Sequence, residues 1–174
     1  DPQMRERRRA IITAPASVRS VGEAVMAADR LLETAKAQAD AQVSERNARE
    51  KAELMRQLGM DEGESATKAS RTMIRQLEED QKRRSKRALT DAIDRALIDL
   101  LAIYRDVLMV QVGGDGELIN TDLSDLVHEI AQDSAPRQTL ARVDHIETAR
   151  KRLVSNGNPL LVLEDMAISL RPQA

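Results

Sequence analysis

Apolar side chains recur at helical spacing along most of the chain, and the clearest stripe lies between residues 88 and 112. Its members are spaced by three or four residues, which places them on one face of an α-helix. They are Leu89, Ile93, Leu97, Leu100, Tyr104, Val107, Leu108 and Gln111. Because this stripe includes the single aromatic residue of the protein, we expect a core helix here.

Helix start and stop signals predict further helices around this one. Ser20 and Glu23 fit a capping box, in which each side chain bonds a backbone amide at the helix start, so a long helix should follow and end near Gly59. Asn120 or Thr121 is expected to cap a short helix. The predicted helices of the bundle span residues 17–32, 89–112, 121–131, 137–155 and 159–170.

The last of these boundaries rests on the segment Asn156-Gly157-Asn158-Pro159. Glycine tolerates a left-handed cap at the end of one helix, and proline suits the first turn of the next. In the same way, Ser134-Ala-Pro136 is expected to begin the preceding helix, over residues 137–155.

Residues 33–87 carry a narrower stripe with charged flanks, which predicts an antiparallel coiled-coil hairpin. The acidic segment 60–66 would be its turn. At about 1.5 Å per residue, the arm over residues 33–58 would project its tip roughly 35–40 Å from the bundle. Its role is open between a docking arm for a partner protein and a tolerated helical insertion. The expected contact positions are Ala39, Val43, Ala48, Ala52 and Met55 on one arm and Ala69, Met73, Leu77, Arg84 and Ala88 on the other.

Composition favours this all-α interpretation. Only 1% of the residues are aromatic, so aliphatic side chains must build the core. We therefore predict an all-α helical bundle over residues 16–174, with residues 33–87 as a projecting hairpin. The charged segment 1–15 begins with Asp1 rather than methionine and is interpreted as a linker or the end of a preceding domain.

No catalytic or metal-binding constellation emerges from the residues. Cysteine is absent, and His128 and His145 fall on separate predicted helices, so neither a metal site nor a cofactor is predicted. The loop over residues 113–120 lacks the ligand spacing of an EF-hand and the Gly-Lys-Ser/Thr ending of a P-loop. No apolar run is long enough to cross a membrane. The sequence predicts a cytosolic interaction domain rather than an enzyme.

Charge does not indicate a nucleic-acid-binding domain. The net charge is −2, although basic residues cluster at positions 5–9 and 82–87. No aromatic residues interleave with them for base stacking, and acidic residues precede the second cluster at helical spacing. We interpret both clusters as solvated segments, so nucleic-acid contact is not expected.

Two segments resemble a known family. The sequence LLAIYRDVLMVQVG, residues 100–113, resembles the collar helix of bacterial clamp-loader subunits, and NGNPLLVLEDMAISL, residues 156–170, resembles the last helix of the same domain. The segments SVRSVGEAVMAADRLLETAKAQ and QLEEDQKRRSKRAL are similar to the delta-prime subunit of DNA polymerase III in its actinobacterial form. The resemblance covers most of the chain.

The resemblance implies a C-terminal collar domain, a non-catalytic oligomerisation domain that holds the clamp-loader ring together for sliding-clamp loading in DNA replication. Its partners would be the gamma/tau and delta subunits, with a possible additional protein at the hairpin and no membrane contact. The candidate partner-binding residues are Tyr104, Arg105 and Asp106, for which a core tyrosine and a surface ion pair are the alternatives. The hairpin departs from the shorter collars of the family, so contacts over residues 33–87 do not carry over.

Two other classes remain open at this stage. A coiled-coil adaptor or scaffold would self-associate through the hairpin. A helical enzyme with an unrecognised carboxylate site is the third class, and the scattering of Asp and Glu along solvated faces speaks against it.

Overall fold

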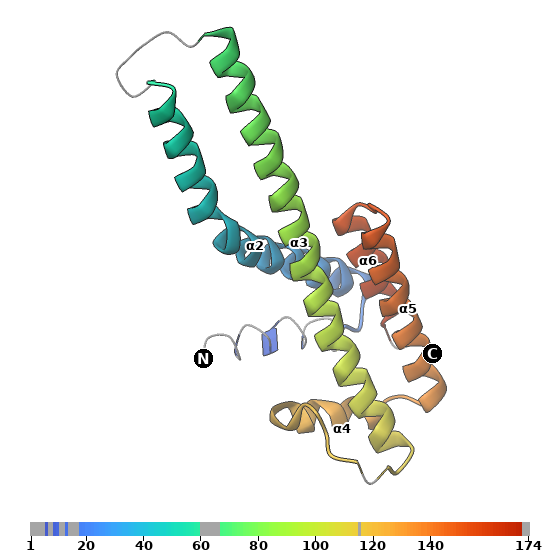
Figure 1. Cartoon of the computed structure of the whole chain (residues 1–174). Helices are drawn as coiled ribbons and strands as arrows, with labels where there is room; N and C mark the ends of the chain where they lie inside the picture. Colours follow the sequence, from blue (N-terminus) through green and yellow to red (C-terminus); the bar gives the residue numbers. More distant parts are fainter. Residues whose placement is uncertain are drawn as a thin grey trace. The chain divides into compact units, whose positions relative to one another are not determined.

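A computed structural model describes residues 18–59, 67–114 and 116–171, together with residues 6, 9, 10 and 13. The predicted linker, apart from those four positions, and the predicted turn over residues 60–66 lie outside the described residues. Every regular element in the described part is a helix, which confirms the all-α prediction. The elements in Figure 1 are α2 (Val21–Gln57), α3 (Lys68–Gln111), the 3-10 helix η2 (Thr121–Leu123), α4 (Ser124–Gln132), α5 (Pro136–Val154) and α6 (Pro159–Ser169).

The chain divides into two compact units. The first contains residues 1–35 and 93–174, and the second contains residues 36–92. Helices α2 and α3 are each continuous and contribute a segment to both units. The hairpin predicted over residues 33–87 overlaps the second unit.

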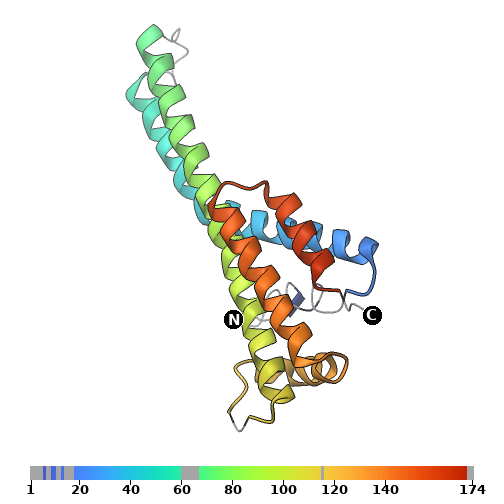
Figure 2. The same cartoon turned by 90° about the vertical axis from the view of Figure 1, so that its right-hand side faces the viewer.

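The first unit has an aliphatic core, as its composition requires. The predicted stripe on α3 is buried from Ile93 to Val107, and α5 and α6 lie side by side beside it in both views (Figures 1 and 2). Side-chain hydrogen bonds join α3 to α5: Arg150 donates to Asp94 at 2.7 Å, and the Thr139 hydroxyl donates to Gln111 at 2.8 Å. The fully buried side chains of this core include Ile93, Leu97, Leu100, Ile103, Tyr104, Val107, Val127, Ile146 and Leu163.

The capping box at the start of α2 is confirmed. The Glu23 amide donates to the Ser20 hydroxyl at 3.1 Å, and the Ser20 amide donates to the Glu23 carboxylate at 3.2 Å. These two bonds satisfy amides that have no intrahelical partner at a helix start. Pro136 and Pro159 occupy the first turns of α5 and α6 as predicted.

Two local predictions are wrong. Neither Asn120 nor Thr121 caps a helix through its side chain at the start of η2, because Asn120 is buried and its amide donates to Asp106 instead. At the end of α5 the left-handed residue is Asn156, with φ of 63°, and not Gly157. Glycine is required at position 157 for close approach, since a Cβ there would lie 2.8 Å from the Arg152 carbonyl oxygen.

In the second unit the two arms are antiparallel, because contact partners descend along α3 as they ascend along α2. Arg84 donates to Asn47 at 2.7 Å, whereas Lys51 lies 3.2 Å from Glu78. Ala39, Val43 and Ala88 are buried as predicted, but Ala48, Ala52 and Ala69 are exposed. The side chains that are buried or half-buried in the hairpin recur at spacings of three and four residues, and those three alanines are not among them. These side chains include Asn47, Glu50 and Leu54 on α2, Leu58 directly after it, and Ser70, Ile74, Leu77, Gln81 and Arg84 on α3.

The centre of this contact is polar. Arg84 donates to both the Asn47 side chain and the Glu50 carboxylate, and Gln81 donates to the Asn47 carbonyl oxygen at 2.9 Å. Hydrogen bonds from Arg84 and Arg46 lower the pKa of Glu50 to about 2. The two arms are therefore joined by a specific hydrogen-bond network as well as by apolar packing.

Candidate partner-binding surface

The predicted site residues Tyr104, Arg105 and Asp106 lie on consecutive positions of α3 but in different surroundings. Tyr104 and Asp106 are fully buried, whereas the Arg105 side chain is 45% exposed. Their assignment to partner binding stays a prediction. Tyr104 and Asp106 contact the interior of the first unit. They would therefore affect a partner only through the residues that they hold in place.

Asp106 holds the loop that follows α3. One carboxylate oxygen accepts from the Ile119 amide at 3.1 Å and from Arg105 at 2.7 Å. The other accepts from the backbone and side-chain amides of Asn120 at 2.8 and 2.9 Å. Arg105 also donates to the carbonyl oxygen of Glu117 at 3.2 Å. This cluster fixes the loop between α3 and η2, which the sequence predicted only as a turn.

The pKa of Asp106 reflects two opposed effects. Burial raises the pKa of a carboxyl group, but the hydrogen bonds from Asn120, Arg105 and Ile119 favour the charged form. The hydrogen bonds prevail, so the pKa of Asp106 lies below its ordinary value of 3.8. Asp106 is therefore a buried carboxylate that remains charged at neutral pH.

Tyr104 is enclosed by the bundle, and its hydroxyl has no hydrogen-bond partner among the described residues. Burial raises the pKa of Tyr104 to about 12, while the positive charge of Arg142 acts in the opposite direction. The Arg142 guanidinium carbon lies 5.9 Å from the centre of the Tyr104 ring, which is within the range of a cation–π contact. The ring, rather than the hydroxyl, makes the favourable contact.

Replacing Tyr104 with phenylalanine is therefore expected to raise the free energy of unfolding by about 1 kcal/mol. The variant keeps the ring beneath Arg142. It removes a buried hydroxyl that loses its hydrogen bonds to water on folding and gains none in the protein. Urea denaturation of the two proteins measures the difference. A decrease of similar size would show that the hydroxyl has a hydrogen-bond partner in solution.

Sequence reasoning missed the residues that Tyr104 and Asp106 contact. Asn120 was expected to cap a helix, and Arg142 was not singled out, because its position on α5 reveals no partner. A signal was available for Arg142: it occupies a helix position in phase with the buried residues Thr139, Ile146 and Ala149. A charged residue on a buried face is unusual unless it is paired.

Several large apolar side chains of the first unit remain exposed. At the turn between α5 and α6, Val154 is 75% exposed and Leu161 is 63% exposed. On α3, Ile98 is 45% exposed next to the buried Leu97. Single exposed apolar residues are ordinary. The other large apolar side chains of this unit that are exposed are Val21, Met26, Val112, Ile119 and Leu140.

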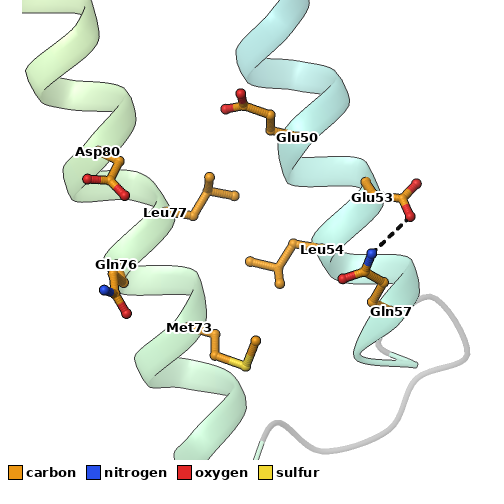
Figure 3. A pocket seen from close by; sticks show the side chains of 8 residues that line it. All are labelled: Glu50, Glu53, Leu54, Gln57, Met73, Gln76, Leu77 and Asp80. Carbon is orange, nitrogen blue, oxygen red and sulfur yellow. Dashed lines mark hydrogen bonds between the residues drawn. The ribbon is translucent and has the colours of Figure 1, made fainter.

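The second unit has an open groove of about 390 Å³ between its two arms. Leu54, Leu77 and Met73 point into the gap (Figure 3). The acidic side chains beside it are engaged with neighbours on their own arm or across the hairpin: Glu50 with Arg84, Asp80 with Arg83, and Glu53 with Arg56. The groove is thus apolar in its interior, with charge pairs along its rim.

Neither a metal centre nor a membrane segment is evident in the described part of the chain. It contains no group of three or more His, Cys, Asp or Glu side chains placed to hold a metal ion. None of its helices combines the length and apolarity needed to span a membrane. His128 and His145 are both exposed and lie on different helices, α4 and α5.

The fold defines the chain as an all-α protein built from long packed helices. No protein-family model and no solved structure matches it. Over 72 residues it is 35% identical to the DNA polymerase III subunit delta' of Bacillus subtilis (strain 168), a match that covers 41% of this chain and 22% of that protein. The chain thus matches about a fifth of the relative's length. The similarity supports a clamp-loader-related protein.

Proposed function

We propose that the first unit is a clamp-loader collar of the delta-prime type, in the actinobacterial form: a non-catalytic oligomerisation domain. The observation that carries the proposal is the 35% identity to a DNA polymerase III delta' subunit, in a chain whose described regular elements are all helices. The domain would join gamma/tau and delta subunits into a ring for clamp loading during DNA replication. Its setting would be the cytoplasm, without direct contact to membrane or nucleic acid.

The proposed interface consists of side chains that the bundle leaves exposed. Val154 and Leu161 would pack against the helices of a neighbouring subunit, since burying exposed apolar area favours association. Arg105, held by Asp106 and Glu117, would supply an ordered charge near the α3–η2 loop. Tyr104 and Asp106 would shape this surface from beneath.

Mixing the full chain with the gamma/tau collar of the same organism, followed by sedimentation at physiological salt, tests the proposal. We expect a complex that also forms when residues 36–92 are replaced by a short glycine-serine linker, because these residues make up the second unit. Circular dichroism of the shortened variant verifies that it remains helical. Failure of the intact chain to bind would contradict the collar proposal.

The alternative function is a coiled-coil adaptor that self-associates through the hairpin. The groove lined by Leu54, Met73 and Leu77 favours it, because a second copy of the hairpin could bury these side chains. In the same sedimentation experiment this function predicts dimers of the intact chain that are lost on removal of residues 36–92. Leu77→Glu would abolish such dimers, whereas Lys82→Gln, at an exposed position of α3, would preserve them.

A further inference from the structure

Arg142 is a buried cation without an acidic partner. The residue is 7% exposed, yet it makes no salt bridge or hydrogen bond with any described residue. Its contact with the Tyr104 ring offsets part of the charge but supplies no oxygen acceptor for its five N–H donors. The Tyr104 hydroxyl is the one fully buried side-chain N or O atom without a partner among the described residues, so the Arg142 nitrogens are open to water or to a ligand.

A small cavity adjoins this side chain. It has a volume of about 100 Å³ and lies between α5 and the end of α6. The described residues that line it are Gln138, Ala141, Arg142, His145, Ser169 and Arg171. Two are arginines, one is a histidine, and none is acidic. The charge at the cavity is therefore positive.

We infer that this cavity is an oxyanion site that takes a single carboxylate or phosphate group, with Arg142 as its principal ligand. A guanidinium presents N–H donors in a planar fork that matches two oxygens of either group. Arg171 and His145 add donors at the cavity wall, and Gln138 and Ser169 provide neutral polar groups. The site is independent of the clamp-loader assignment, because it follows from the side chains alone.

The size of the cavity limits the occupant. Its volume of about 100 Å³ is several times the roughly 10–15 Å³ that a single water molecule needs. That space accommodates one compact oxyanion. The group would be a free anion or the end of a side chain that a partner inserts.

Inorganic phosphate and acetate are the probes. Each is titrated into the full chain at constant ionic strength, while NMR follows the Nε–H resonance of Arg142 and thermal unfolding is recorded in parallel. We expect a saturable resonance shift and, at a ligand concentration ten times Kd, a midpoint raised by about 3–5 °C. Tighter binding of acetate would identify a carboxylate as the occupant, and tighter binding of phosphate would identify a phosphate group. No saturable binding of either anion would overturn the inference.

Variants separate specific binding from the general effect of salt. Arg142→Met should lose the anion-dependent rise in the midpoint, and Arg142→Lys, which keeps the charge without the fork, should bind about tenfold more weakly. Arg137→Met removes an exposed arginine from the same helix and should bind as the unmodified chain does. An equal rise in all four proteins would contradict the site, since phosphate also stabilises proteins by exclusion from their surface.

Discussion

Replacing Asp106 with asparagine is expected to lower the free energy of unfolding of the first unit by about 3 kcal/mol. Each carboxylate oxygen of Asp106 accepts two hydrogen bonds, from Ile119 and Arg105 on one side and from Asn120 on the other. An asparagine retains one oxygen and turns an NH₂ group toward donors, whichever way its amide is oriented. Hydrogen bonds to a charged group contribute about 1.5–3 kcal/mol each, and here at least two are lost.

Asp91→Asn is the matched control, because Asp91 lies on the same helix and is exposed. Its effect should stay within about 0.5 kcal/mol. Urea denaturation measures both variants, and hydrogen exchange of the Ile119 and Asn120 amides reports whether the loop itself opens. Unchanged protection of those two amides in Asp106→Asn would contradict the role assigned to the carboxylate.

The same carboxylate makes the stability of the first unit sensitive to acid. Because the folded-state pKa of Asp106 lies below its ordinary value of 3.8, the unfolded chain takes up the proton more readily than the folded chain does. Its contribution is fully present above about pH 5 and is lost as the pH falls through the folded-state pKa. The difference in stability between the original chain and Asp106→Asn should therefore shrink below about pH 4.

Features set by local sequence were predictable, and features set by distant pairing were not. The stripe on α3 and the capping box of Ser20 and Glu23 involve residues three or four positions apart, so helical geometry alone places them. Asp106 and Asn120 are separated by a loop, and Tyr104 and Arg142 lie on different helices. Periodicity contains no information on which side chains two separate helices bring together.

The hairpin shows how an emphasis on apolar residues can shift a predicted contact. Small residues suggested Ala48 and Ala52 as contact positions, but strict helical spacing from Val43 leads to Asn47 and Glu50. Those polar side chains fit the contact because Arg84 satisfies both of them. Arg84 lies on the other arm, so the sequence of the first arm does not reveal it as their partner. For this reason the polar residues Asn47 and Glu50 were not predicted as contact positions.

A second large effect is expected in α6, where neighbouring leucines differ in burial. Leu163 is fully buried, so Leu163→Ala should lower the free energy of unfolding by about 3 kcal/mol through lost apolar burial and the cavity that remains. Leu161 is 63% exposed, and Leu161→Ala should change stability by less than about 0.5 kcal/mol. Thermal and urea unfolding of the two variants test the contrast directly.

The variants Leu163→Ala and Leu161→Ala also distinguish an effect on folding from an effect on association. If Leu161 is a central contact in the proposed collar interface, Leu161→Ala should weaken binding to gamma/tau by about tenfold, which corresponds to about 1.4 kcal/mol. Leu160→Ala, at the half-buried preceding position, provides a comparison on the same helix. If Leu161→Ala binds gamma/tau as tightly as the original chain does, Leu161 is not part of the interface. The interface then lies away from this turn.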